Sequence, residues 1–224
     1  MLNIVINRFK QGCRTIKFPK GKLPVLPSRY RGRPIIAGQG EELDLGKKTF
    51  IPDENIQYTN DFRMAVSERQ NLKLKDREII LAHALHKKML RIFGRSLKLR
   101  QVSAGGCNAC ELDLNVLSTV VFDLSRFGIQ FVASSRHADG IVVTGPITRN
   151  MRESLQKTYA AIPDPKIVIA LGSCAISGGI FADSPEVSQG LDPMIPVDLF
   201  IPGCPPHPLT ILDGLLRLLG RIKR

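Results

Sequence analysis

The sequence predicts an α/β fold in which a mostly parallel sheet is covered by helices on both faces. Over residues 97–224, short apolar runs rich in β-branched residues alternate with longer segments of helical periodicity. Gly and Pro are frequent between these runs, as expected for the loops of such a fold. The apolar share of 43% and the charged share of 23% are ordinary for a globular chain of 224 residues, so disorder throughout is excluded.

Five strands and three helices make up the expected sheet domain. The strands are expected at residues 97–102, 129–133, 140–144, 167–171 and 197–201. The helices are expected at residues 113–127, 149–161 and 209–222. Gly128 follows the first helix, Pro163 follows the second, and Pro208 stands near the first turn of the third. Alternation of this kind is typical of a doubly wound sheet of the flavodoxin type.

Residues 1–96 are predicted to form a basic extension, an extended arm plus an amphipathic helix, in front of the α/β domain at 97–224. Residues 1–100 hold 22 Lys and Arg against 9 Asp and Glu, whereas residues 101–224 hold 10 against 11. Residues 17–40 are rich in Pro, which favours an extended backbone. The charge asymmetry indicates a surface for nucleic acid, an anionic membrane or an acidic partner, although a solvated tail has the same composition.

The amphipathic helix of this extension is expected at residues 76–93. Its apolar residues recur at helical spacing from Leu81 to Phe93. Asp76 stands where it can cap the helix, and Gly94 stands where the helix can end. We expect its apolar stripe to pack on protein rather than to lie on a membrane.

No membrane span is expected, because the longest apolar runs are far shorter than the roughly 18–20 residues that a span needs. Residues 1–8 show no basic segment before an apolar run, so no secretory signal is expected. Five Cys in a chain of this length are not a disulfide-dense composition, and without an export signal the thiols are expected to stay reduced. Metal binding, catalysis or packing then remain as roles for the cysteines.

Four of the five cysteines follow the carboxyl ends of predicted strands and precede helices. They are Cys107, Cys110, Cys174 and Cys204. In an open α/β sheet the loops converge at this edge, and ligands bind there. Gly and Pro in these loops let the backbone come close to a ligand. Helices that start near residues 112, 175 and 208 would direct their N-termini to the same place.

Four thiolates can hold a zinc ion or an iron–sulfur cluster, and four inert buried cysteines are a third alternative. Structural zinc sites usually combine two short Cys-x₂-Cys pairs, whereas here one pair is followed by two isolated cysteines. The step from Cys204 to Pro205 also occurs in ferredoxin ligand segments, which favours a cluster. Cys13 lies among basic residues without a partner pattern and is expected to be a free thiol.

Several segments of the second part, taken in order, match one known family. They are residues 105–111, 126–129, 136–139, 144–148, 172–174, 178–181, 196–198 and 201–206. They resemble the small electron-transfer subunit that membrane-bound [NiFe] hydrogenases of the formate hydrogenlyase type share with respiratory complex I. The resemblance implies a flavodoxin-like fold and one [4Fe–4S] cluster, with Cys107, Cys110, Cys174 and Cys204 as its ligands.

The spacing of the first two cysteines separates the branches of this family. Complex I subunits resemble one another in two adjacent cysteines, with a Glu three residues further on. In this chain two residues separate Cys107 from Cys110, and Glu111 follows directly. This spacing resembles that of the hydrogenase subunits. The resemblance therefore implies a relay between a Ni–Fe-type large subunit and ferredoxin-like iron–sulfur subunits. It also implies integral membrane subunits as neighbours and a peripheral position on the cytoplasmic side of the cell membrane.

Three further residues are candidates for contact with the cluster or the partner. Glu111 is expected either to contact the large subunit or, at a helix start, to complement the helix dipole. His137 is a candidate for tuning the cluster, although a histidine held in a turn by the backbone is the simpler alternative. Arg136 is expected to bond a cluster sulfur, a partner carboxylate or an ordinary surface acid.

Two rival functions stay open. One is a complex I-like module that passes electrons to quinone, which would be expected to carry adjacent cysteines. The other is a zinc-stabilised nucleic-acid-binding protein, favoured only by the basic arm, which lacks interleaved aromatic residues and any nucleic-acid motif. Residues 12–19 and 29–34 resemble the lead-in of the ferredoxin-like subunit of the same complexes, which runs along partner and membrane-arm surfaces. We therefore expect the arm to contact a neighbouring subunit or the membrane surface, and not nucleic acid.

Overall fold

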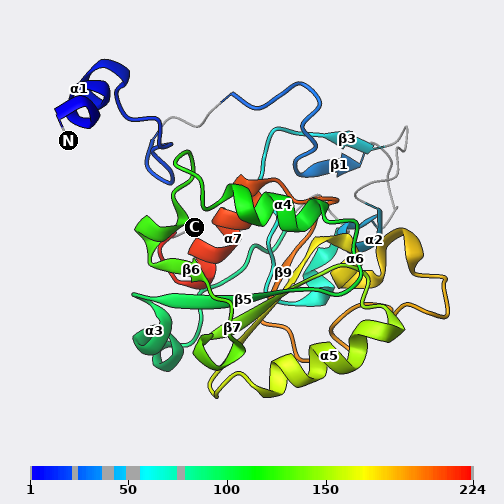
Figure 1. The fold of residues 1–224 in the computed structure, drawn as a ribbon. Coiled ribbons are helices and arrows are strands. Elements are labelled where there is room, and N and C mark those ends of the chain that lie inside the picture. Colours follow the sequence, from blue (N-terminus) through cyan, green and yellow to red (C-terminus); the bar gives the residue numbers. More distant parts are fainter. Residues whose placement is uncertain (1, 22–24, 37–42, 49–55, 75–78, 223–224) are drawn as a thin grey trace.

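The core of the protein is a sheet of five parallel strands in the order β6-β5-β7-β8-β9 (Figure 1). The computed structural model describes residues 2–21, 25–36, 43–48, 56–74 and 79–222. The strands of the sheet are β5 (Leu97–Ser103), β6 (Ile129–Phe131), β7 (Gly140–Thr144), β8 (Ile167–Leu171) and β9 (Leu199–Ile201). Counted from its first strand, the sheet has the order 2-1-3-4-5, which is the flavodoxin-like arrangement. The predicted fold class is confirmed.

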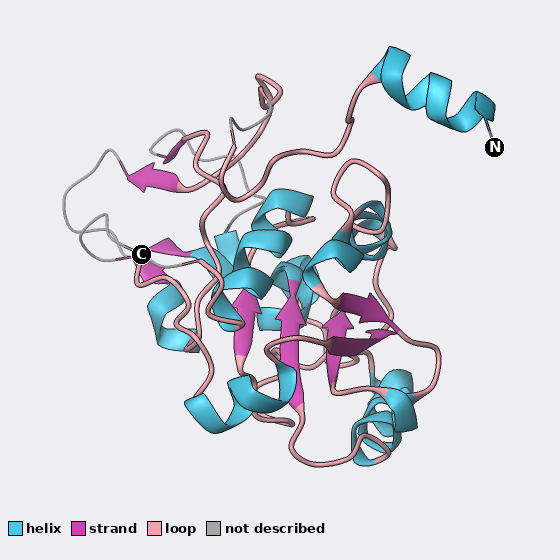
Figure 2. Cartoon of the chain, turned by 90° about the vertical axis from the view of Figure 1, so that its left-hand side faces the viewer, coloured by secondary structure: helices cyan, strands magenta, loops and turns pink. Residues whose placement is uncertain are grey.

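Helices cover both faces of the sheet, as Figure 2 shows from the side. One face carries α3 (Lys87–Phe93), α4 (Ala109–Val116) and α7 (Pro208–Leu218), and the other carries α2 (Leu45–Lys48), α5 (Arg149–Ala160) and α6 (Gly172–Ser177). Strand β7 shows why two layers are needed: Val142 packs into the first layer, whereas Ile141 and Val143 pack into the second. All five residues of β7 and of β8 are buried, as in parallel strands with both faces covered.

The helix expected at residues 113–127 differs from the helix that forms. Helix α4 runs from Ala109 to Val116, and a separate 3₁₀ turn follows at Leu124–Phe127. The Thr119 hydroxyl donates to the carbonyl of Val116 at 2.7 Å, at the point where the helix ends. Side chains such as Ser and Thr compete in this way with the helical ladder, so the apolar spacing alone predicted too long a helix.

The helix expected at residues 76–93 is also shorter than predicted. Residues 75–78, including the proposed cap Asp76, lie outside the described residues, and residues 79–86 are not helical. Two backbone amides of this stretch donate to distant parts of the chain instead: Ala82 to the carbonyl of Ala65 and Leu85 to the carbonyl of Leu218. Helix α3 then begins at Lys87. Bonds to the folded domain therefore replace the helical turns expected at residues 79–86.

Residues 43–48 and 56–74 pack on the sheet domain, so part of the predicted extension belongs to the core. Strand β2 (Leu43–Asp44) pairs with β4 (Lys73–Leu74) after the 3₁₀ helix η1 (Arg69–Leu72). Val66 and Phe200 exchange two backbone hydrogen bonds, of 3.0 and 2.9 Å, along the outer side of β9. This bridge covers part of the edge that a terminal strand would otherwise expose. The predicted domain boundary at residue 96 stays a prediction, but the described residues in 43–74 do not form a detached arm.

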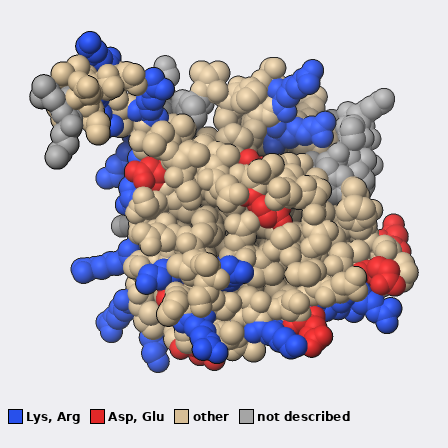
Figure 3. Space-filling view, in the orientation of Figure 1, with Lys and Arg blue, Asp and Glu red and all other residues tan. Residues whose placement is uncertain are grey.

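The helix at the start of the chain, α1 (Leu2–Gln11), stands apart from the sheet domain in Figure 1. The chain returns to the domain at Ile16, whose amide donates to the carbonyl of Val121 at 2.9 Å, and at Thr15, whose hydroxyl donates to the carbonyl of Val120 at 2.8 Å. In Figure 3, Lys and Arg side chains gather over α1 and near α3. Among the described helices, none is both long enough and apolar enough to span a membrane.

A first prediction tests whether residues 43–74 fold together with the sheet. Leu72 is fully buried in the second core layer, so Leu72→Ala is expected to lower the free energy of unfolding by about 2–5 kcal/mol in one cooperative transition. The control Ile80→Ala removes a similar side chain that is 58% exposed and is expected to change it by about 0.5 kcal/mol or less. The measurement is chemical denaturation of the full chain followed by circular dichroism. Equal effects of the two variants would contradict the packing described here.

Candidate functional site

Three loops at the carboxyl edge of the sheet bring four cysteines to one recess. Cys107 follows β5 and Cys110 lies in the first turn of α4; Cys174 lies in α6 after β8, and Cys204 follows β9. The recess is small, with an accessible volume of about 20 Å³. It is lined by Gly106, Cys107, Ala109, Cys110, Glu111, Gly145, Ser173, Cys174, Gly203, Cys204 and Pro205. The structure thus gathers the four residues that the strand-end positions single out.

The thiols of the recess influence one another. Burial raises the pKa of Cys110, and Glu111 together with the other three thiols raises it further. Burial likewise raises the pKa of Cys174 to about 11, with added contributions from Cys204 and Cys107. Four neighbouring thiolates would therefore repel each other strongly, and a bound metal cation is the group that would relieve this repulsion and displace their protons.

Gly172 and Gly179 have no side chain, and this leaves room for the sulfur atoms of two of the cysteines. A Cβ added at Gly172 would lie 2.7 Å from the Sγ of Cys110, and one added at Gly179 would lie 2.7 Å from the Sγ of Cys174. Both residues also have positive φ, +84° and +59°, which other residues rarely adopt. The backbone can approach the sulfur atoms this closely only because these positions are glycine.

Glu111 fastens the start of α4 to the sheet. Its side chain is buried, and the hydroxyl of Thr144, the last residue of β7, donates to Oε1 at 2.6 Å. The carboxylate also lies in the first turn of α4, where a negative charge complements the helix dipole. Of the two roles expected for Glu111, the structure therefore favours the complement to the helix dipole over a contact with a large subunit.

Arg136 and His137 do not lie at the recess. They belong to a short 3₁₀ turn, Ser135–His137, that precedes β7, whereas the cysteine loops follow the carboxyl ends of the strands. Both side chains are exposed at the amino-terminal edge of β7. The length of a five-residue strand, about 16 Å, separates the two edges, so this position does not favour a contact with a group held by the cysteines, and the roles expected for Arg136 and His137 stay predictions.

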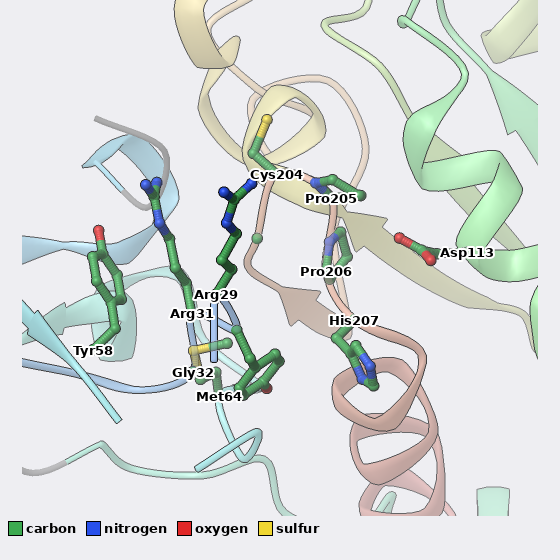
Figure 4. A pocket seen from close by; sticks show the side chains of 12 residues that line it. Arg29, Arg31, Gly32, Tyr58, Met64, Asp113, Cys204, Pro205, Pro206 and His207 are labelled. Atoms are coloured by element: carbon green, nitrogen blue, oxygen red, sulfur yellow. The ribbon is translucent and has the colours of Figure 1, made fainter. Parts of the chain in front are cut away.

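A second, larger recess adjoins Cys204, and sequence reasoning did not find it. It has a volume of about 470 Å³, and Arg29, Tyr30, Arg31 and Tyr58 of the first part line it together with residues 203–207 (Figure 4). The sequence indicated a Pro-rich basic stretch and a family resemblance at residues 29–34, but no recess beside Cys204. The feature of the sequence that could have indicated this recess is Arg-Tyr-Arg at residues 29–31, in which one cation stands on each side of an aromatic residue.

The fifth cysteine lies apart from the others. Cys13 is exposed near the end of α1, and hydrogen bonding from Thr15 lowers the pKa of its thiol, with a smaller contribution from Arg8. Among the residues that the structure describes, no three Cys, His, Asp or Glu side chains are close enough to share a single metal ion.

The fold and the recess define a class of protein: a doubly wound α/β subunit with four cysteines at the carboxyl edge of its sheet. The chain belongs to the family described as NADH ubiquinone oxidoreductase, 20 Kd subunit, which matches residues 107–218. The family match begins at the first of the four cysteines and covers them all.

Two relatives show how this family is distributed among complexes. The probable membrane-bound hydrogenase subunit mbhJ of Pyrococcus furiosus is 42% identical over 136 residues, which cover 61% of this chain and 81% of that protein. Formate hydrogenlyase subunit 7 of Escherichia coli is 43% identical over 136 residues, 61% of this chain and 53% of that protein. Proteins named as subunits of NADH-quinone oxidoreductase, as in Heliobacterium modesticaldum, are 43–44% identical over 50–54% of this chain. The relatives are thus subunits of oxidoreductase complexes.

A solved structure supports the fold. A chain of the membrane-bound sulfane sulfur reductase, an archaeal respiratory membrane complex, is 35% identical to this chain and superposes with a TM-score of 0.53. The match covers 61% of this chain and 75% of the other. A subunit similar to this chain thus occurs in proteins named for four oxidoreductase complexes: membrane-bound hydrogenase, formate hydrogenlyase, NADH-quinone oxidoreductase and sulfane sulfur reductase.

A second prediction tests the space between Gly172 and Cys110. Gly172→Ala is expected to lower both the metal content of the purified chain and its melting temperature, because the new Cβ would overlap the sulfur atom. Gly12→Ala is a matched control, since Gly12 also has positive φ, +66°, but has no atom within 4 Å of the added Cβ. Its effect is expected to be confined to the strain at the end of α1. Metal analysis and thermal melting measure both variants, and equal metal loss in both would contradict the steric argument.

Proposed function

We propose that this chain holds one [4Fe–4S] cluster on Cys107, Cys110, Cys174 and Cys204 and relays single electrons within a membrane-associated oxidoreductase complex. The observation that carries the proposal is the recess in which these four thiols, and no other cysteine of the described residues, come together. A [4Fe–4S] cluster bound by four thiolates supplies reversible one-electron transfer. Electron relay needs no acid, base or nucleophile from the protein.

The residues of the chain hold and shield such a group. Cys110 and Cys174 lie half-buried at the floor of the recess, whereas Cys107 and Cys204 are exposed. The N-terminus of α4 points to the recess and complements the negative charge of a thiolate-bound cluster. The bond from Thr144 to Glu111 keeps this helix end in place. The group would thus be fixed by the sheet on one side and open to a partner on the other.

Exposed apolar side chains beside the recess support docking of a large subunit there. Leu112 on α4 is 57% exposed two residues after Cys110, and Ile180 is 67% exposed directly after Gly179, which touches Cys174. Apolar residues flanking a functional recess are typical of a subunit interface. A large subunit seated on this surface would cover the exposed thiols and bring its own redox centre close to them.

We propose a Ni–Fe-type large subunit and ferredoxin-like iron–sulfur subunits as the redox partners, with integral membrane subunits nearby. The spacing of Cys107 and Cys110, followed directly by Glu111, supports the hydrogenase branch. A complex I-like role, with quinone as the acceptor, is the second candidate, and the description of the family favours it. Nickel analysis of the complex that co-purifies with the chain separates the two: nickel in the large subunit supports the first, and its absence with a quinone-reducing complex supports the second.

Helix α1 supports a peripheral contact with the membrane surface. Ile4 and Phe9 are 73% and 85% exposed, and Arg8 and Lys10 lie in the last turn of the same helix. A helix with exposed apolar side chains and cations is suited to an anionic lipid surface, where each cation contributes about 1 kcal/mol. We propose that α1 makes this contact while the sheet domain stays in the aqueous phase.

A third prediction tests the ligand set. After anaerobic purification, the wild-type chain is expected to contain iron and sulfide and to show an EPR signal on reduction. Cys110→Ala is expected to abolish or convert that signal, because one of the four thiolates is lost. Cys13→Ala provides a control with the same substitution, and it is expected to leave iron content and spectrum unchanged. Zinc without a reducible signal in the wild type would contradict the proposed cluster and favour the zinc-binding alternative.

A fourth prediction tests the membrane contact. The double variant Ile4→Ser with Phe9→Ser is expected to reduce flotation of the full chain with vesicles rich in anionic lipid by at least threefold, because two exposed apolar side chains no longer enter the lipid interface. Val25→Ser removes another exposed apolar side chain, away from α1, and is expected to have no effect. Equal loss of flotation in both variants would contradict a specific role for α1.

A further inference from the structure

We propose that Arg29 and Arg31 bring positive charge to the Cys204 side of the recess and thereby raise the reduction potential of the group held there. The inference rests on the proposed cluster, but it concerns residues outside the ligand loops. It gives the first part of the chain a role in setting the driving force of electron transfer.

The larger recess places these arginines beside a proposed ligand. Arg29 and Arg31 form one wall, and Gly203, Cys204 and Pro205 form part of the other. In Figure 4 the guanidinium group of Arg29 extends toward Cys204, and that of Arg31 lies further out on the same side of the recess. Cys204 is exposed, and it lines both this recess and the smaller recess that the other three cysteines line.

Tyr30 ties this segment to the loop that follows Cys204. Its ring packs edge-on against the ring of His207, with 5.2 Å between the ring centroids, and it contacts the first core layer. His207 is the N-cap of α7, where its Nδ1 accepts from the amide of Leu209 at 3.1 Å. The aromatic anchor between the two arginines is therefore fixed to a residue only three positions after Cys204.

Backbone contacts hold the rest of the segment. The amide of Gly32 donates to the carbonyl of Thr59 at 3.0 Å, and a side chain at this position would overlap the carbonyl oxygen of Thr59. Strand β1 (Pro34–Ile36) then pairs with β3 (Ile56–Tyr58). The guanidinium of Arg31 lies over the ring of Tyr58, 5.5 Å from its centroid. The two arginines are thus carried by an ordered framework rather than by a loose tail.

The electrostatic consequence follows from the sign of the charges. Reduction adds one electron to an already anionic group, so nearby cations stabilise the reduced form and raise the potential. One acidic residue, Asp113, lines the same recess, and burial raises the pKa of its carboxyl. Positive charge therefore dominates the described lining of this recess. Because the arginines are exposed, added salt should weaken their effect.

The experiment is a redox titration of the cluster signal in the full chain, purified anaerobically with whichever subunits accompany it. The test variants are Arg29→Gln, Arg31→Gln and the double variant. Each single variant is expected to have a lower midpoint potential than the wild type, and the double variant is expected to show about the sum of the two shifts. The shifts should shrink as salt is raised from low to about 0.5 M.

Two controls separate charge from structure. Arg136→Gln removes an exposed cation at the opposite edge of the sheet and is expected to leave the potential unchanged. The double variant Arg29→Lys with Arg31→Lys keeps both positive charges and is expected to retain most of the wild-type potential. If the effect depended instead on the hydrogen bonds of the guanidinium groups, this variant would lower the potential as the Gln variants do. Unchanged potentials in the Gln variants, or a shift in Arg136→Gln as large as theirs, overturn the inference. A wild-type chain without iron and sulfide overturns the proposed function itself, which is a different result.

Discussion

The cost of ionising half-buried cysteines that lie side by side is the constraint on which the site depends. Burial raises the pKa of Cys110 and of Cys174, and the neighbouring cysteines and Glu111 raise it further, so these two thiols resist ionisation until a cation joins them. Only a rigid backbone keeps such groups together. Parallel strands supply it, because their carboxyl ends meet at one edge, and glycine at positions 172 and 179 lets the loops close around the sulfur atoms.

The sequence predicted the features that depend on local pattern and failed where distant contacts decide. Strands β7 and β8 have the predicted bounds, since runs such as Ile167–Leu171 have one stable arrangement in a covered parallel sheet. The helix expected at 76–93 does not form over residues 79–86, because the amides of Ala82 and Leu85 bond to residues 65 and 218, which no local pattern reveals. The cysteines could be grouped from strand ends alone, whereas the sequence pattern did not show that the turn holding Arg136 precedes its strand.

The first part of the chain combines two kinds of structure that differ in charge. Residues 43–74 hold five Lys and Arg and five Asp and Glu, and the described residues among them contribute Leu45, Leu72 and Leu74 to the core and bridge β9 through Val66. Helix α1 has Arg8 and Lys10 and no acidic residue, and it exposes Ile4 and Phe9. Net charge describes association and not fold, so the excess of +13 in residues 1–100 does not by itself locate a domain boundary.

The arrangement of the extension relates these parts to one another. The chain passes from α1, through the contacts of Thr15 and Ile16 with the loop after α4, to the segment at Arg29 and Arg31 beside Cys204. The proposed surface contact of α1 and the proposed charge effect of Arg29 and Arg31 thus concern one continuous stretch of fewer than 35 residues. The ring contact between Tyr30 and His207 holds the second part of this stretch against the start of α7. A membrane or partner bound at α1 would therefore leave the position of the two arginines beside Cys204 to the contacts of the folded domain.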